Sequence, residues 1–434
     1  MSLSNTEFES ATTVLPAPSA LQRFARATLF KALARLHTGT LTLHESGERT
    51  LFGAPEGDGP RAELWVMHPD FYTSVLLGGS VGAGESFMAG HWHASDLVGV
   101  IRLMSRNLDV IDGMEGGLAA AGRPLLKALH WLRKNTRAGS RANIAAHYDL
   151  GNDFFSAFLD PEMMYSSAVF PEPHADLERA AVHKLDRICR KLDLQPDDRV
   201  IEIGTGWGGF AIYAAKEFGC QVTTTTISRA QFAHAERRIR EEGLTDRITL
   251  LRQDYRDLRG RFDKLVSIEM IEAVGHQFLD RYFETCARLL EPDGLMLIQA
   301  ITMPDDRYHR ALREVDFIKR YIFPGSFIPS VGAMVGSMGR TTDLRLVHLE
   351  DQTPHYARTL ALWAENFRQS RDREAIAALP ERFRRMWEFY LAYCEGGFWE
   401  RVIGSAQLVF AKPQNRRDAI LQGLGWHAPA HEPA

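Results

Sequence analysis

The most regular pattern of hydrophobic and polar positions lies between residues 196 and 302. Short apolar and β-branched segments alternate there with longer segments that read as helices. The predicted strands are 199–203, 221–226, 248–251, 262–268 and 295–301. Because strands alternate with helices, the pattern predicts a parallel, doubly wound α/β sheet.

The segment 303–400 is predicted to be mainly helical and is rich in aromatic side chains. In an ordinary domain most of these rings would simply pack in the core. So many in one insertion also suit a pocket for a long apolar ligand. A last strand is predicted at 405–411.

The N-terminal pattern mixes a helix at 22–36 with strands at 40–43 and 62–66. It predicts a small α+β domain. The glycine-rich stretch 78–90 lacks the Lys-Ser/Thr pair of a phosphate-binding loop. We therefore interpret it as a turn-rich connector.

A basic segment separates this domain from the large α/β region. It carries six basic residues and no acid, interleaved with Leu and Trp: Arg123, Lys127, Arg133, Lys134, Arg137 and Arg141. This pattern is typical of a helix lying on an anionic membrane surface, and equally of a solvated helix between domains. The predicted division is 1–20 a disordered lead, 21–111 the small domain, 112–141 the basic linker, 142–413 the catalytic domain and 414–434 a tail.

Composition narrows the class of protein. The chain has 434 residues and a net charge of −4, so it has no global attraction for nucleic acid. Its 4 cysteines are scattered and show no zinc spacing, and we expect no metal site. We find no signal peptide and no apolar run that could span a bilayer. The expected location is the cytoplasm, in peripheral association with the inner face of the cell membrane.

Candidate chemistry begins at the glycine loop after the first strand. Glu202 precedes Gly204, Gly206 and Gly208 in a strand–loop–helix context. Glycines let the backbone approach a ligand at the carboxyl end of a strand, where open α/β sheets bind their ligands. The spacing alone does not separate a dinucleotide from S-adenosylmethionine.

Three details favour the methyl donor. The second strand ends in threonines, where a dinucleotide site needs an acid for the ribose. Gln253 and Asp254 follow the third strand and offer an amide and an acid to an adenine ring. Glu202 is placed to meet a cationic amino group.

Several motifs occur together in an order that marks a family. They are GESFMAGHW at 84–92, NIAAHYDLGNDFF at 143–155, MYSSA at 164–168, VIEIGTGWGG at 200–209, TISRAQ at 226–231, QDYRD at 253–257, EMIEAVG at 269–275, DFIKRYIFP at 316–324 and YCEGGF at 393–398. From about residue 60 to 412 the chain resembles the cyclopropane-fatty-acyl-phospholipid synthases.

The resemblance implies a Rossmann-like class I methyltransferase domain with a helical lipid-binding insertion, and a possible homodimer. It implies S-adenosylmethionine as donor and a cis double bond in a phospholipid acyl chain as acceptor. The implied donor site comprises Tyr165, Ser166, Glu202, Gly204, Thr205, Gly206, Thr226, Ile227, Ser228, Gln231, Gln253, Asp254 and Tyr255.

Methyl transfer to an alkene creates a carbocation, which needs a dry, aromatic site and then a base to remove a proton. The resemblance implies bicarbonate as that base. Its implied shell is Glu272, Gln299, Tyr356 and the backbone of Ile301 and Ser167. Glu272 would accept the bicarbonate proton.

This chain departs from the family pattern at Gln299, where many members have His, and at Ser167, where many have Cys. An amide still donates an N–H to an anion. The departures leave open a methyl- or methylene-branched product without ring closure. A non-catalytic lipid-binding module on the same scaffold is the alternative from another class, against which the intact glycine loop and Glu272 argue.

Two further residues need an interpretation. Cys394 is included in the catalytic region as a pocket-lining residue, because ring formation has no acyl step that needs a nucleophile. Glu269 lies three residues before Glu272, and we expect it to be an ordinary surface helix residue.

Overall fold

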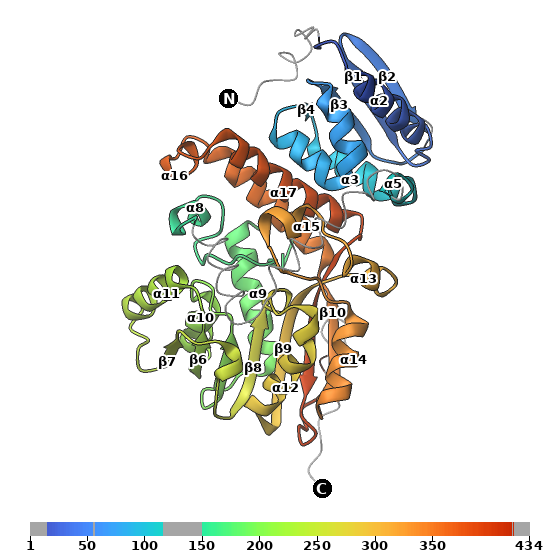
Figure 1. Ribbon diagram of the computed structural model, residues 1–434. Coiled ribbons are helices and arrows are strands. Elements are labelled where there is room, and N and C mark those ends of the chain that lie inside the picture. The colour runs from blue at the N-terminus through green and yellow to red at the C-terminus, as the bar shows by residue number, and fades with distance from the viewer. Residues whose placement is uncertain (1–14, 55–56, 116–149, 419, 421–434) are drawn as a thin grey trace.

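The computed structural model describes residues 15–54, 57–115, 150–418 and 420. They form two units, each built on its own sheet (Figure 1). Most of the predicted lead, the basic linker from residue 116 onward and most of the tail lie outside the described residues. The membrane interpretation of the linker therefore stays a prediction.

The N-terminal unit is a four-stranded sheet in the order β2-β1-β3-β4, with helices packed on it. β1 and β3 are parallel, and the outer strands are antiparallel to them. β2 and β4 were not predicted. The elements are α2 (Ala20–Leu33), β1 (Thr40–Glu45), β2 (Glu48–Gly53), β3 (Arg61–Val66), α3 (Asp70–Met88), β4 (Trp92–Ala94), α4 (Leu97–Arg106) and α5 (Leu108–Glu115).

The interpretation of the glycine-rich stretch as a connector is wrong, because most of it lies inside α3. The helix kinks at Gly79, whose φ is 55°. Gly84 shows why small residues are needed here, since a Cβ at this position would lie 2.4 Å from the Phe317 ring. The glycines thus allow α3 to pack closely against the second unit.

The second unit is the predicted doubly wound sheet, with seven strands in the order β10-β11-β9-β8-β5-β6-β7. All neighbours from β9 to β7 are parallel, and β11 runs antiparallel to both β9 and β10. The strands are β5 (Arg199–Ile203), β6 (Gln221–Thr225), β7 (Ile248–Leu251), β8 (Phe262–Ile268), β9 (Leu290–Thr302), β10 (Arg345–Asp351) and β11 (Gly404–Ala411). The fold class is confirmed, and the strand order changes direction at β5, where such sheets bind ligands.

The helices that cover this sheet and its far end follow the expected segments. They are α8 (Asn152–Ser156), α9 (Leu177–Leu192), α10 (Gly209–Glu217), α11 (Arg229–Glu241), α12 (Leu279–Leu289), α13 (Asp305–Ala311), α14 (Val331–Thr341), α15 (Thr353–Gln369), α16 (Glu374–Ala377) and α17 (Glu381–Trp399). Short 3-10 turns lie at η2 (Tyr255–Asp257), η3 (Ile271–Ala273) and η4 (His276–Phe278), and η5 (Ile318–Ile322) is a π turn. Within the described residues, no helix is both long and apolar enough to cross a bilayer.

The segment 303–400 contains one strand that sequence reasoning missed. β10 mixes polar and apolar residues without regular alternation and lies at the edge of the sheet, with Val347 and Leu349 exposed. A half-exposed edge strand lacks the continuous apolar run that marks the buried strands.

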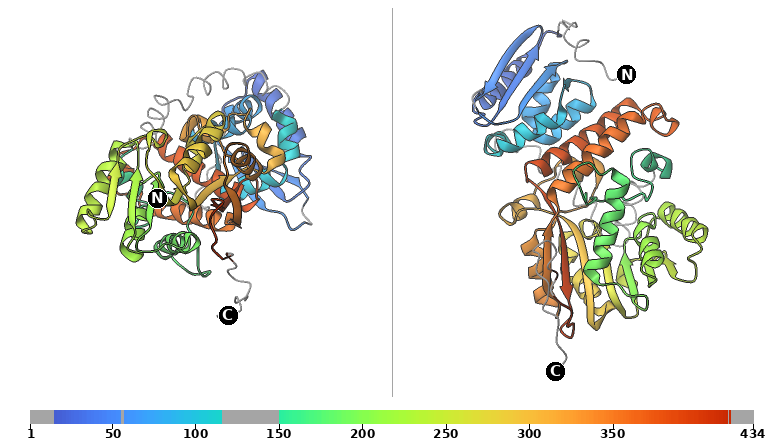
Figure 2. Two further views of the ribbon diagram at one scale, coloured as in Figure 1. Left: turned by 90° about the horizontal axis from the view of Figure 1, so that it is seen from below. Right: turned by 180° about the vertical axis from the view of Figure 1, so that it is seen from behind.

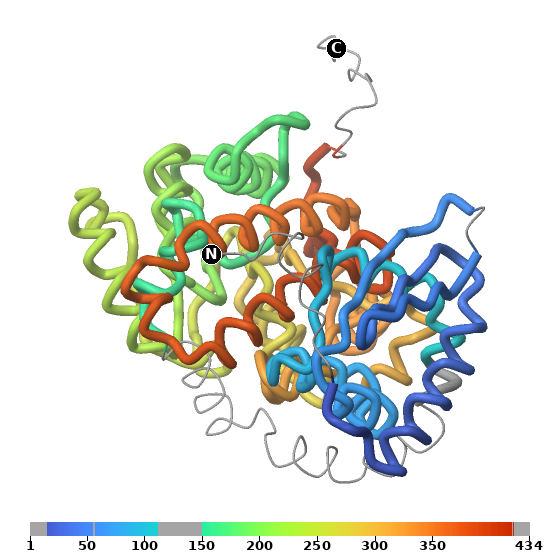
Figure 3. Tube along the Cα trace, turned by 90° about the horizontal axis from the view of Figure 1, so that it is seen from above, coloured from blue at the N-terminus to red at the C-terminus, as the bar shows by residue number. Residues whose placement is uncertain are grey.

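The two units are in direct contact along α17, which packs against α3 and α4. Glu400, just after α17, accepts from Arg102 at 2.7 Å and from Arg106 at 2.5 Å. Seen from behind, α17 lies between the N-terminal unit and the large sheet (Figure 2). The view from above shows α17 running alongside the N-terminal unit (Figure 3).

Candidate active site

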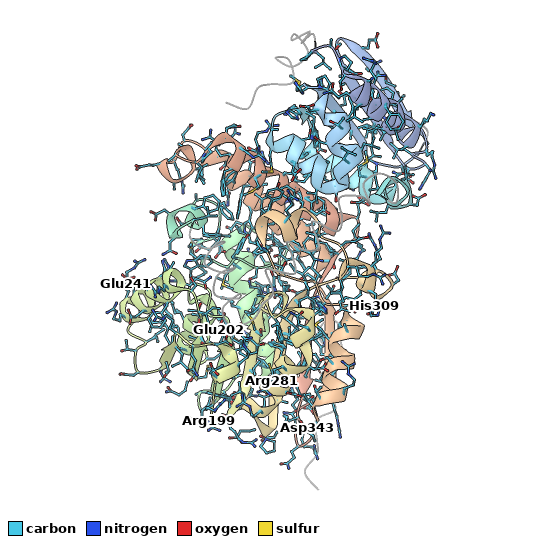
Figure 4. The ribbon with its side chains drawn as sticks, viewed as in Figure 1. Arg199, Glu202, Glu241, Arg281, His309 and Asp343 are labelled. Carbon is cyan, nitrogen blue, oxygen red and sulfur yellow. The ribbon has the colours of Figure 1, made fainter. Side chains whose placement is uncertain are left out.

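The glycine loop joins β5 to α10 at the end of the sheet that faces the N-terminal unit. Figure 4 places Arg199 and Glu202 at opposite ends of β5, with Glu202 nearer to that unit. Gly204 has a φ of 104°, and a Cβ there would lie 3.3 Å from Met270. Gly206 has a φ of 54° and open space where a Cβ would point. The loop therefore presents bare backbone.

Glu202 is a buried acid beside this loop. Its carboxylate accepts from Thr224 Oγ1 at 2.6 Å, and that threonine also contacts Thr205 at 2.7 Å. Burial raises the pKa of Glu202 to about 8, and the Thr224 hydrogen bond opposes the rise. A cationic group bound next to Glu202 would stabilise the charged form, which is what the predicted amino-group contact requires.

The segments after β6 and β7 supply the other side of this pocket. Thr226 Oγ1 donates to Gln231 Oε1 at 3.0 Å, and both residues are buried. Asp254 forms an ion pair with Arg256 at 2.6 Å and begins the turn η2. Gln253 and Tyr255, on either side of Asp254 in sequence, also line the pocket.

One cavity of about 640 Å³ connects these residues. All predicted donor residues line it except Ser228. Ser228 instead is the N-cap of α11, and its Oγ accepts from the backbone N–H of Gln231 at 3.3 Å. Its hydroxyl is therefore used to begin a helix, and its place in the donor site stays a prediction.

The predicted catalytic residues converge on the same cavity. Glu272, Ile301, Tyr356 and Cys394 line it. Gln299 and Ser167 are fully buried behind the lining. The structure thus brings together residues from β9, α15, α17 and the segment before α9, which are far apart in sequence.

The expectation for Glu269 is wrong: it lines the cavity and is the centre of this cluster. It follows β8 directly, and its backbone N–H donates to Gln299 O at 2.8 Å. Its Oε1 accepts from the Ser167 backbone N–H at 2.9 Å and from Gln299 Nε2 at 2.8 Å. Its Oε2 accepts from the Tyr356 hydroxyl at 2.7 Å. Three of the groups assigned to bicarbonate therefore contact a carboxylate of the chain itself.

Glu272 lies in the next turn, η3. Its Oε1 accepts from the Ile301 backbone N–H at 2.7 Å. Its Oε2 is buried without a hydrogen-bond partner among the described residues. Burial, and then the adjacent charge of Glu269, raise the pKa of Glu272 to about 8.

Burial also raises the pKa of Glu269, but hydrogen bonds from Gln299, Tyr356 and Ser167 oppose that rise. Lys184 lies behind the cluster, fully buried, and donates to Ser166 Oγ at 2.7 Å. Burial lowers the pKa of Lys184 to about 8, and the charges of Glu269 and Asp160 oppose that change. Sequence reasoning missed Lys184, because a lysine inside an amphipathic helix reads as a surface residue.

A chain of two buried hydrogen bonds holds the side-chain oxygen of Gln299. Gln407 Nε2 donates to Gln299 Oε1 at 2.9 Å, and Lys191 Nζ donates to Gln407 Oε1 at 2.6 Å. Lys191 also pairs with Glu350 on β10. With Gln299 Nε2 held by Glu269 and Ser167 O, every polar atom of this amide has a partner.

Aromatic rings surround the cluster. Tyr356 stacks on Phe398 with ring centroids 4.3 Å apart, and Tyr165 contacts Trp363 at 5.3 Å. Burial raises the pKa of the Cys394 thiol, so it is held as a neutral pocket-lining group. The predicted role of Cys394 as a lining residue fits this position.

A possible metal cluster lies elsewhere. Three ligand-type atoms of His68, Asp70 and His91, in the N-terminal unit, lie within 4.8 Å of one another. Sequence spacing did not predict this group. Asp70 already accepts from Gln22 at 2.7 Å and lies 3.3 Å from His68 Nδ1. None of the three lines the cavity.

Comparison with known proteins points to one family. Residues 135–408 match the family model for mycolic acid cyclopropane synthetase. The chain is 40% identical over 359 residues to the tuberculostearic acid methyltransferase UfaA1 of Mycobacterium tuberculosis, covering 78% of this chain and 81% of that protein. It is 37% identical over 368 residues to the cyclopropane-fatty-acyl-phospholipid synthase of Escherichia coli strain K12, covering 83% and 90%.

Solved structures agree. The cyclopropane synthase MmaA2 from Mycobacterium tuberculosis is similar with a TM-score of 0.59 and 31% identity, over 63% of this chain and 98% of that one. The mycolic acid cyclopropane synthase CmaA1 complexed with SAH and CTAB is similar with a TM-score of 0.59 and 30% identity, over the same shares.

Proposed function

Because this chain belongs to the mycolic acid cyclopropane synthetase family, and is thus an S-adenosylmethionine-dependent methyltransferase acting on lipid, we propose a specific reaction for it. It transfers the donor's methyl group to the cis double bond of an unsaturated phospholipid acyl chain and closes a cyclopropane ring. The residues predicted for the donor fit it: a glycine loop open to a ligand and a buried acid for the amino group.

The observation that carries the proposal is the extent of the single cavity. It runs from the glycine loop past the carboxylate cluster and on into the N-terminal unit. The N-terminal unit contributes apolar lining from α2, β1, β3 and α3: Leu29, Leu33, Leu41, Leu43, Leu64, Phe71 and Val75. A polar donor site continuous with an apolar channel suits a long acyl chain whose reactive bond lies between the two.

Charge at the cavity supports a phospholipid. Arg307 and Arg313 line the cavity, and neither forms an ion pair with any described residue. Arg313 is exposed, and Leu77 on α3, also lining, is 46% exposed. Unpaired guanidinium groups beside exposed apolar surface fit a phosphate headgroup at a bilayer. The proposal includes docking of this face on the membrane.

The residues of the chain have distinct tasks in this reaction. The bound donor supplies an electrophilic methyl group. The rings of Tyr165, Tyr356 and Phe398 exclude water and present π-faces to the positive charge that forms on the acyl chain. The thiol of Cys394, neutral at physiological pH, forms no covalent bond. A proton must then leave the transferred methyl group, which needs an acceptor in the cavity wall.

A second candidate is methyl transfer without ring closure. It is favoured by the likeness to a relative named as a tuberculostearic acid methyltransferase. The two functions share the donor site and the alkene, and they differ in where the proton is lost.

The test is incubation of the purified chain with S-adenosylmethionine and vesicles of an unsaturated phospholipid, followed by mass spectrometry and NMR of the lipid. We expect a gain of one methylene unit and the high-field proton signals of a cyclopropane ring. The same mass gain with the signals of a methyl-branched alkene or of an exocyclic methylene establishes the second candidate. No modified lipid in any vesicle contradicts both.

A further inference from the structure

Glu269 has a backbone conformation that a glutamate adopts at a cost. Its φ is +48°, in the left-handed region, between the end of β8 and η3. A non-glycine residue there costs about 1 kcal/mol or more. Glycine would meet no such cost, so retention of a side chain at this position points to a task for it.

The surroundings show what the side chain is held for. Each of its oxygens is fixed: Oε1 by the Ser167 N–H and Gln299, and Oε2 by the Tyr356 hydroxyl. A carboxylate has about four acceptor positions, so one remains on Oε2. Because Glu269 lines the cavity, that position can face the substrate.

The neighbouring groups set the charge of Glu269. Three donated hydrogen bonds and the ammonium group of Lys184 stabilise its ionised form. Glu272, with one donated hydrogen bond and a bare Oε2, is the better place for a proton. Two adjacent buried carboxyl groups cannot both ionise readily, so the pair divides into a charged Glu269 and a neutral Glu272.

The donor site lies next to this carboxylate. The β-carbon of Met270, the residue after Glu269, would lie 3.3 Å from a Cβ at Gly204 in the glycine loop. The loop that bears Glu269 therefore borders the loop expected to hold the methyl donor. A base for the transferred methyl group must lie within reach of the donor, and the position of this loop at the donor site is consistent with that requirement.

From this geometry we infer that Glu269 is the catalytic base and makes a bound bicarbonate unnecessary. The inference rests on the proposed function. The sulfur–methyl bond breaks as a carbon–carbon bond forms to one alkene carbon, which leaves S-adenosylhomocysteine and a cation at the other alkene carbon. A C–H bond of the methyl group then breaks: its electron pair closes the ring and its proton goes to Glu269. The products are one cyclopropane, one S-adenosylhomocysteine and one proton.

The experiment measures transfer of labelled methyl from S-adenosylmethionine to vesicles of an unsaturated phospholipid, in carbonate-depleted buffer and with added bicarbonate. The wild type should work equally well in both. Glu269→Gly suits the local φ and frees Ser167, Gln299 and Tyr356 to hold an anion. We expect it to lose about 10²–10⁴-fold in turnover without bicarbonate and to recover much of that loss with it.

Two further variants separate a lost base from a disturbed fold. Glu269→Gln fills the same space without a carboxylate, and should be as inactive as the glycine variant but not rescued. Asp193→Gly is a matched control, since Asp193 is also a left-handed residue, with a φ of 54° at the end of α9, and is absent from the cavity lining. It should keep full turnover. Binding of S-adenosylhomocysteine by calorimetry should be unchanged in all three.

The outcomes discriminate sharply. A wild type that requires bicarbonate, or a Glu269→Gly variant with full turnover in depleted buffer, overturns the assignment of Glu269 while leaving the lipid reaction intact. Loss in Glu269→Gly that bicarbonate does not restore, together with weakened binding of S-adenosylhomocysteine, shows a structural role and also overturns it. A wild type that labels no lipid at any bicarbonate concentration overturns the proposed function itself and this inference with it.

Discussion

The two halves of the cavity are built differently. Apart from Tyr165 and Ser166, the donor half consists of consecutive loops at the carboxyl ends of β5, β6 and β7, each close in sequence to its strand. The carboxylate half gathers Glu269 after β8, Gln299 from β9, Tyr356 from α15 and the Ser167 backbone from the segment before α9. The first half is formed mainly by residues close together in sequence, whereas the second half forms only when segments distant in sequence pack together.

This difference predicts how each half responds to amino-acid substitutions. In the donor half, backbone atoms do much of the binding, and the chain needs only glycines and the right strand ends. In the carboxylate half, each side chain is held by another, so a change at one position alters the charge or orientation of the next. Substitutions should therefore act separately in the first half and through coupling in the second.

The largest effect on donor binding is expected from Gly206→Val. Valine at a φ of 54° is strained, and its side chain enters space that is open for the ligand. Together these should weaken donor binding by about 3 kcal/mol, roughly 100-fold. Calorimetric titration with S-adenosylhomocysteine measures it. Unchanged affinity in the folded variant would contradict the assignment of this loop.

A smaller effect is expected from Gln407→Met, which breaks the chain of hydrogen bonds to Gln299. Gln299 loses the donor that fixes its amide, and Lys191 keeps only Glu350. Of the two hydrogen bonds lost, the neutral one to Gln299 bears on the active site; its loss costs about 1 kcal/mol, so kcat should fall about fivefold. The KM for S-adenosylmethionine should not change, because the donor half is not involved. Equal changes in kcat and KM would show that the two halves are coupled.

The same contrast decides what could be predicted from sequence. The parallel sheet, the glycine loop and the neighbouring Glu202, Gln253 and Asp254 follow from local patterns, whereas the other donor residues were implied by the family resemblance. The hydroxyl of Ser228 could face a ligand or begin a helix, and only the position of α11 shows that it caps this helix. β10 was missed because an edge strand with mixed polar and apolar residues has no continuous buried run.

Glu269 shows more clearly what local sequence patterns do not predict. Its spacing to Glu272 suggested one exposed helix face, but the chain leaves β8 in a left-handed conformation and turns both carboxyl groups inward. That turn depends on hydrogen bonds to Ser167 and Tyr356, about 100 and 90 residues away along the chain. Gln407 and Lys191 are separated by 216 residues. No local pattern reports such pairings.

A weaker effect on turnover is expected from Glu272→Gln. Glu272 has a pKa of about 8 and is mostly protonated at pH 7, so a neutral amide is a close substitute. Turnover at pH 7 should stay within about threefold of the wild type, since a lost general base would cost far more. A loss of 10²-fold or more would place the base on Glu272 instead of Glu269.

The same variant has a pH signature in stability. A carboxyl group whose folded-state pKa is raised stabilises the fold below its ordinary pKa near 4.5, and that stability is lost as the pH rises through about 8. The amide cannot ionise. Urea unfolding should therefore show that, between pH 5 and pH 9, the free energy of unfolding of Glu272→Gln rises relative to that of the wild type, by on the order of 1–3 kcal/mol. Parallel stability curves would contradict the raised pKa.

The smallest effect on binding is expected from Ser228→Ala, which tests the boundary of the donor half. Ser228 lies between Ile227, which lines the cavity, and the first turn of α11, yet its hydroxyl accepts from the Gln231 backbone N–H. Removing an N-cap costs about 1 kcal/mol of stability. Affinity for S-adenosylhomocysteine should remain within twofold of the wild type, because Ser228 does not line the cavity. The melting temperature should fall by about 2–4 °C for a unit of this size.

Thr226→Val is the matched comparison, since Thr226 lines the cavity and its side chain donates to Gln231. It should weaken binding more than Ser228→Ala does. If both variants weaken binding equally, the donor reaches the helix N-terminus, and the donor half extends beyond the loops to include α11 itself.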